Sequence, residues 1–149
     1  MLSKSCCDEL MKVVDSKWRN DPSVDFKMTL TFDELSLYIS GESVLALAKL
    51  VNDEYDEIIL RRSEPEGRCI GFHLDVSERV VQVALNDDNC YTGGRLMFLI
   101  GDGKVVVPKR PAGSYTIHNR FVVHGVSEHT TGLRYGLFFI KYKIAEEDF

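Results

Sequence analysis

Two stretches of the sequence carry its strongest pattern: residues 72–94, FHLDVSERVVQVALNDDNCYTGG, and residues 108–139, PKRPAGSYTIHNRFVVHGVSEHTTGLRYGLFF. Both consist of short runs rich in Val, Ile, Leu and aromatic residues, separated by Gly, Pro, Asn and Asp. The first group of residues favours strands, and the second group favours turns. The pattern therefore predicts a protein built largely from short strands.

The same alternation of apolar runs and turns continues on both sides of these stretches. The predicted strands lie within residues 57–63, 67–75, 79–86, 94–100, 104–108, 113–119, 121–126 and 133–143. Before them, helical spacing of apolar residues predicts helices over 7–19 and 42–51, and alternation predicts a strand over 25–32. Many short strands after two helices predict a mainly β protein of the α+β class, an antiparallel sandwich or jelly roll with the N-terminal helices supporting one face.

Length and composition limit the possible functions. The 149 residues fit a single domain, 1–149, and 44% hydrophobic with 28% charged residues is typical of a globular protein. The net charge of −5 argues against general attraction to nucleic acid or to anionic membranes. The sequence contains neither an apolar run of about 20 residues nor a secretory signal. No C-x-x-C pair occurs among the four cysteines, so we expect reduced thiols and a cytoplasmic or nuclear location.

Three residues stand out as metal-ligand candidates. His73 and Asp75 form an H-x-D pattern on a predicted strand, and residues i and i+2 of a strand point to the same face. A second imidazole, His124, ends the apolar run FVV. Two histidines and one carboxylate can form a facial triad that leaves three coordination positions of a ferrous ion open. Each residue taken alone could equally be an ordinary hydrogen-bonded side chain, and His118 could replace His124 in the ligand set.

The order and spacing of six elements strengthen the metal hypothesis, because together they resemble the iron(II)- and 2-oxoglutarate-dependent dioxygenases. Over residues 58–142, the sequence motifs are most similar to those of the prolyl and procollagen-lysyl hydroxylase catalytic domains. The matching elements are His73-x-Asp75, Leu85-Asn86, Gly93-Gly94, Pro108-Lys109 with Gly113, His124-Gly125-Val126, and Arg134-Tyr135. Ile70 and Gly136 depart from the family pattern, in which Tyr and Ser are common.

The resemblance implies a double-stranded β-helix, or jelly roll, with one metal site. His73, Asp75 and His124 resemble the Fe(2+) ligands of the family. Arg134 resembles the residue that holds the distal carboxylate of the cosubstrate 2-oxoglutarate, and a guanidinium suits that task because it can bind a carboxylate through two parallel hydrogen bonds. Gln82 takes a strand position where related lysyl hydroxylases carry Asn, which implies a contact with the cosubstrate. O2 is the co-reactant, and ascorbate is a common accessory reductant in the family.

By this resemblance the chain is an enzyme that hydroxylates a prolyl or lysyl residue of a peptide or protein, with release of succinate and CO2. Three alternatives stay open: an oxygenase of the same superfamily acting on a small molecule or nucleobase, a catalytically silent jelly-roll module that binds a partner, and a cupin-like protein using another metal. Arg134 favours the 2-oxoglutarate-dependent oxygenases over both the silent module and the cupin-like protein, because only 2-oxoglutarate gives that residue a role.

The remaining polar residues receive more ordinary interpretations. We expect His129, in the turn SEHTTG, to be exposed to solvent. Arg61, Arg62 and Arg68 either form a solvated edge or line an entrance to the site. The segments 64–68 and 87–92 are expected to flank that entrance.

Overall fold

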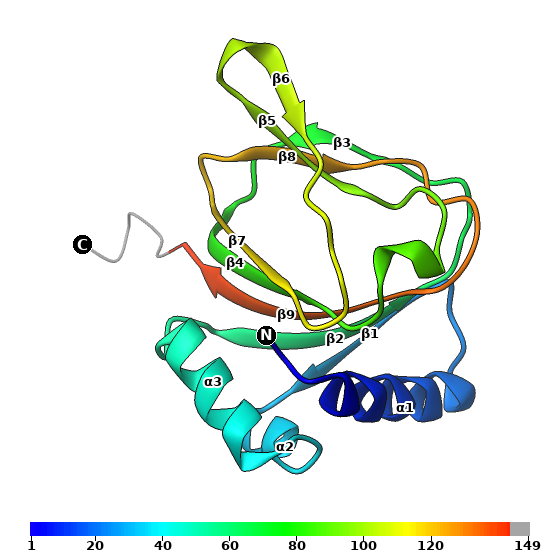
Figure 1. Ribbon diagram of the computed structural model, residues 1–149, viewed down its shortest axis with the longest axis vertical. Coiled ribbons are helices and arrows are strands. Elements are labelled where there is room, and N and C mark those ends of the chain that lie inside the picture. The colour runs from blue at the N-terminus through cyan, green and yellow to red at the C-terminus, as the bar shows by residue number, and fades with distance from the viewer. Residues whose placement is uncertain (144–149) are drawn as a thin grey trace.

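Two antiparallel sheets face one another in the computed structural model, which describes residues 1–143 (Figure 1). The larger sheet has the order β1 (Asp25–Leu30), β2 (Glu57–Ser63), β9 (Arg134–Tyr142), β4 (Ser77–Ala84) and β7 (Tyr115–Asn119). The smaller sheet has the order β3 (Ile70–His73), β8 (Val123–Val126), β5 (Leu96–Ile100) and β6 (Lys104–Val106). Every strand region predicted from the sequence contains a strand, and the predicted jelly roll is confirmed.

Buried and partly exposed residues alternate along β2, so the two faces of the larger sheet differ. In β2, Ile58 and Leu60 are buried against the helices, whereas Arg61 points to the opposite face, toward the smaller sheet. In β9, Leu137 and Phe139 likewise join the core beneath the helices. This face buries most of the apolar side chains, so the inner face of the barrel is left for polar residues.

Three helices cover the outer face of the larger sheet: α1 (Lys4–Asn20), α2 (Phe32–Ser36) and α3 (Gly41–Val51) (Figure 1). Helix α1 begins three residues before the predicted start, because the side chain of Ser3 accepts a hydrogen bond from the backbone N–H of Cys6 at 3.2 Å. Cys6 and Cys7 belong to this helix, and both are buried. None of the helices in residues 1–143 is both long and apolar enough to cross a membrane.

The prediction of one strand over residues 25–32 is wrong at its end. The strand stops at Leu30, and Phe32 begins the short helix α2. Thr31 and Glu34 form a reciprocal capping box, in which each side chain accepts a hydrogen bond from the backbone N–H of the other residue. This local pairing fixes a helical turn in a segment whose apolar alternation favours a strand.

Two short 3₁₀ turns interrupt the connections: η1 (Asp88–Cys90) lies between β4 of the larger sheet and β5 of the smaller sheet, and η2 (Gly101–Gly103) lies between β5 and β6. Just after η1, Gly93 adopts a left-handed backbone with φ +69°, and a Cβ atom there would overlap the carbonyl oxygen of Glu128. The Gly-Gly element of the sequence is therefore needed because two loops pack backbone to backbone.

We expect Gly93→Ala to lower the free energy of unfolding by about 1–2 kcal/mol or more. An L-residue is disfavoured in the left-handed region, and its Cβ would displace the neighbouring loop. Gly101→Ala is the matched control, since nothing lies within 4 Å of a Cβ at that position. Denaturant unfolding of the two variants measures the difference. Equal stability of both variants would contradict this account of the loop contact.

Candidate metal centre

His73, Asp75 and His124 come together at one end of the barrel. One ligand atom from each lies within 4.8 Å of the others. His73 is the last residue of β3 and pairs directly with His124 of β8, so the two rings stand 4.5 Å apart between centroids. Asp75 follows two residues after His73, on the same side of the chain. Three residues singled out in the sequence are thus brought to one point.

Backbone hydrogen bonds orient both imidazoles. Nδ1 of His73 lies 2.8 Å from the carbonyl oxygen of Gly71, and Nδ1 of His124 lies 3.0 Å from that of Val122. Because a carbonyl oxygen can only accept, each Nδ1 carries a proton, which leaves Nε2 as the nitrogen that is available to a metal ion. The two Nε2 atoms face Oδ1 of Asp75 at 3.2 and 3.4 Å.

His118 of β7 is a third imidazole beside the cluster. Its Nε2 donates to Oδ2 of Asp75 at 2.9 Å, and its ring lies 4.2 Å from that of His124. Burial lowers the pKa of His118, the neighbouring His124 acts in the same direction, and the Asp75 hydrogen bond opposes both. His118 is therefore a neutral donor that holds one carboxylate oxygen, while the other oxygen faces the two ligand nitrogens.

The donor set suits a ferrous ion. Two imidazole nitrogens and one carboxylate oxygen are the donors of a facial triad, and a hydrogen-bonded carboxylate is a typical supporting arrangement for a metal ligand. Phe98 closes one side of the cluster, with its ring 5.9 Å from His118 and 6.3 Å from His124.

Nδ1 of His118 and Oγ1 of Thr116, both on the inner face of β7, are buried without a partner in the described residues. Such atoms are expected where the barrel interior receives a polar ligand or water.

A second polar group, of arginine side chains around one small cavity, includes one residue missed in the sequence. Arg110, in the loop before β7, is only 4% exposed and donates through Nη1 to Oε1 of Gln82 at 3.1 Å. Gln82 belongs to β4 and is itself buried. The sequence offers little signal for Arg110, because an Arg in a Pro-rich loop is usually exposed.

Arg134 begins β9 and lines a small cavity together with Arg110 and Gly136. Burial lowers the pKa of Arg134 to about 10, and the positive charge of Arg110 adds to this effect. A hydrogen bond to Tyr91 acts in the opposite direction. The nearby Arg61 differs from both, because Asp25 accepts from its guanidinium at 2.7 and 2.8 Å.

Two other sequence interpretations are revised. His129 was expected to be exposed, but it is only 7% exposed, its Nε2 lies 2.6 Å from the carbonyl oxygen of Gly132, and its ring packs against Gly94. Arg62 does not line an entrance: it is buried on the helix side, where it pairs with Asp15 and stacks on Trp18 at 3.8 Å. Both residues therefore hold the scaffold together.

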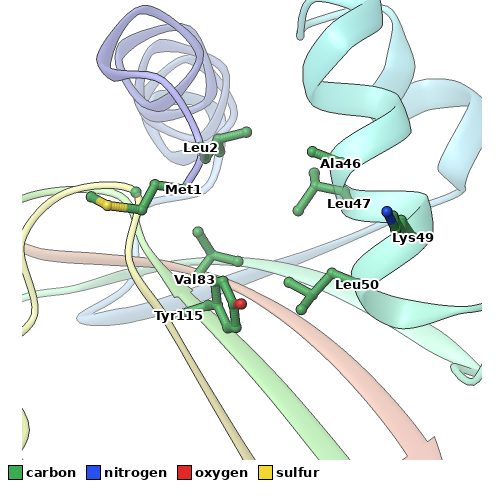
Figure 2. Close-up of a pocket in the computed structure, with 9 residues that line it drawn as sticks. Met1, Leu2, Ala46, Leu47, Lys49, Leu50, Val83 and Tyr115 are labelled. Carbon is green, nitrogen blue, oxygen red and sulfur yellow. The ribbon is translucent and has the colours of Figure 1, made fainter.

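A separate apolar hollow of about 250 Å³ lies on the helix side of the larger sheet (Figure 2). Figure 2 shows Leu47 and Leu50 of α3 facing Val83 and Tyr115 of the sheet, with Met1 and Leu2 on the other side. Its lining contains neither a carboxylate nor an imidazole. It therefore lacks the carboxylate and imidazole groups that the barrel interior contains.

Comparisons with known proteins agree on the fold. No protein-family model matches the sequence, and no curated protein matches it either. A prolyl-4-hydroxylase from Pseudomonas putida superposes with a TM-score of 0.66 at 15% identity, over 96% of this chain and 89% of that chain. A prolyl hydroxylase from Trichoplax adhaerens gives 0.66 at 17% identity, over 93% and 78%. The non-heme alpha ketoglutarate dependent epimerase SnoN from nogalamycin biosynthesis gives 0.69 at 15% identity, over 93% and 73%. At these identities the likeness concerns the fold, which is the jelly roll of the 2-oxoglutarate- and iron-dependent oxygenases.

We expect His73→Ala and His124→Ala to abolish tight Fe(II) binding, because each removes a nitrogen donor. His118→Ala should lower the affinity by about 10- to 100-fold, the usual effect of losing a residue that holds a ligand. Anaerobic calorimetry with Fe(II), on variants shown by circular dichroism to be folded, measures this. His129→Ala removes an imidazole outside the cluster and serves as the control. Equal losses in His118→Ala and His124→Ala would instead identify His118 as a ligand.

Proposed function

We propose that the protein is an Fe(II)- and 2-oxoglutarate-dependent dioxygenase that hydroxylates a prolyl or lysyl residue of a peptide or protein. One observation supports this function most directly. The barrel that holds His73, Asp75 and His124 also buries Arg134, for which no carboxylate partner occurs within residues 1–143. A metal-binding cluster and a cationic group, both within the barrel, fit a ligand that chelates the metal and carries a second, negative group.

Each residue has a defined role in this proposal. His73 and His124 present Nε2, and Asp75 presents Oδ1, to Fe(II). His118 keeps Oδ2 of Asp75 engaged, so that the carboxylate offers one oxygen. Arg134 binds the distal carboxylate of 2-oxoglutarate, and Gln82 accepts a hydrogen bond from Arg110, which lines the same small cavity as Arg134.

When bound, Fe(II) supplies the chemistry that activates dioxygen. Overall, O2, 2-oxoglutarate and a substrate C–H group give succinate, CO2 and the hydroxylated substrate. One atom of O2 enters succinate, and the other becomes the new hydroxyl group of the substrate. The protein contributes position and exclusion of water, because the inner faces of both sheets enclose the reactants. The pairing of Arg134 with the distal carboxylate keeps the chelating end of 2-oxoglutarate directed toward the metal site.

An open groove beside Asp75 supports a polypeptide substrate. The groove measures about 520 Å³, and its lining consists of Leu74, Asp75, Val76, Arg120, Phe121, Tyr142 and Lys143. Val76 is 87% exposed and Phe121 is 72% exposed, which makes the rim apolar. Exposed apolar surface next to a site is typical of a surface that a partner covers. The Trichoplax structure was solved with a peptide fragment bound, which also favours this class of substrate.

We expect the iron-loaded protein to form succinate slowly from 2-oxoglutarate in air, even without substrate. Ascorbate is included in the assay to keep the iron reduced. His73→Ala should lose this activity, because one of the two nitrogen donors is absent. If the wild-type protein neither forms succinate nor binds 2-oxoglutarate by calorimetry in the presence of metal, the dioxygenase proposal is wrong.

We expect Phe121→Ala to lower the rate of peptide hydroxylation by about 10-fold or more, since burying a Phe side chain contributes about 1.5–3 kcal/mol. Mass spectrometry of prolyl and lysyl peptides, which detects the gain of one oxygen atom, measures the rate. Leu45→Ala is the control, because Leu45 is 73% exposed but lies on α3, on the far side of the larger sheet. Unchanged hydroxylation in Phe121→Ala would exclude the groove as the substrate site.

A further inference from the structure

We infer that Arg110 is a second binding residue for the distal carboxylate of the cosubstrate, so that two guanidiniums hold this group between them. The inference rests on the proposed function, because it concerns the same pocket. It assigns a role to a residue outside the motifs singled out in the sequence. It also predicts which class of 2-oxo acid the pocket accepts.

The charge balance of the pocket is the first reason. Arg110 and Arg134 line the same small cavity, and the charge of Arg110 lowers the pKa of Arg134. Their side-chain hydrogen bonds go to neutral groups, Gln82 and Tyr91. Within the described part of the chain neither guanidinium forms an ion pair. Two buried like charges with neutral partners are unfavourable unless an anion lies between them.

A carboxylate close to Arg110, that of Asp88, already has two other hydrogen-bond donors. Oδ2 of Asp88 accepts from the backbone N–H of Arg110 at 2.8 Å and from the guanidinium of Arg95 at 2.8 Å. Burial lowers the pKa of Arg110, and the nearby Tyr91 hydroxyl and Asp88 carboxylate offset this only in part. The side chain of Arg110 is therefore left with donors that the protein itself does not neutralise.

The loop that carries Arg110 is rigidly held, which suits a binding residue. The backbone N–H of Ala112 donates to Asp87 at 2.7 Å, and that of Gly113 donates to the carbonyl oxygen of Ala84 at 2.7 Å. Together with the Asp88 contact, these bonds fix the loop against β4. Gln82 then fixes the direction of the guanidinium. Gln82 is therefore a positioning residue that acts on the cosubstrate through Arg110.

This arrangement selects a dicarboxylic 2-oxo acid. A carboxylate bound by two guanidiniums receives several charge-assisted hydrogen bonds and neutralises part of the cationic charge. A monocarboxylic 2-oxo acid of the same length would place a methyl group there and leave both cations without an anion. The discrimination should therefore depend on Arg110 as well as on Arg134.

Calorimetry on the Zn(II)-loaded protein, with 2-oxoglutarate and with 2-oxopentanoate, tests the inference. We expect Arg110→Gln to weaken 2-oxoglutarate binding by about 10- to 100-fold, the usual range for a hydrogen bond between charged groups, and to leave 2-oxopentanoate binding unchanged. Lys109→Gln, which removes the adjacent exposed cation, should change neither affinity. Arg110→Lys keeps the charge without the planar donor pair, so it should give a smaller loss.

The outcomes separate this inference from the function on which it rests. If the wild-type protein binds neither acid in the presence of metal, the proposed function fails. If the wild-type protein binds 2-oxoglutarate and Arg134→Gln weakens it, but Arg110→Gln does not, only the role of Arg110 is wrong. Equal weakening of both acids by Arg110→Gln would indicate a structural role. If Arg110→Gln does not fold, wild-type affinity in Arg110→Lys overturns the inference.

Discussion

The antiparallel pairing of β3 with β8 is the constraint on which the metal centre depends. It sets His73 opposite His124, and the carbonyl oxygens of Gly71 and Val122 then fix the direction of each ring. A slip of one residue would turn one imidazole to the outer face of the sheet, because side chains alternate along a strand. The remaining parts of the site, including the carboxylate of Asp75, are built around this pair.

The barrel interior is divided electrostatically along its length. In one part, three imidazoles surround the carboxylate of Asp75, and in another part Arg110 and Arg134 line one small cavity. The apolar core lies on the opposite face of the larger sheet, beneath the helices. The fold can therefore accommodate polar groups inside the barrel, because its stability comes mainly from burial elsewhere.

Local sequence patterns predicted the strands well because each run shows its own alternation and is bounded by turn residues. They failed where a local contact overrode the alternation, as in the capping box of Thr31 and Glu34 that begins α2. They also failed for His129, whose burial depends on a loop that packs against Gly94 from a distant part of the chain. Spacing within one segment carries no information about such contacts.

The sequence by itself predicted where the strands lie along the chain, because the strand period acts within a few residues, and it singled out His73, Asp75 and His124 through the H-x-D spacing and the family resemblance. Only the tertiary structure decided the roles of His118 and Arg110. The first becomes a donor to Asp75, and the second becomes a buried cation beside Arg134, through contacts between segments far apart in the chain. The physical reason is that burial and hydrogen-bond partners arise from the packing of the two sheets, and this packing sets the charge and protonation of each side chain.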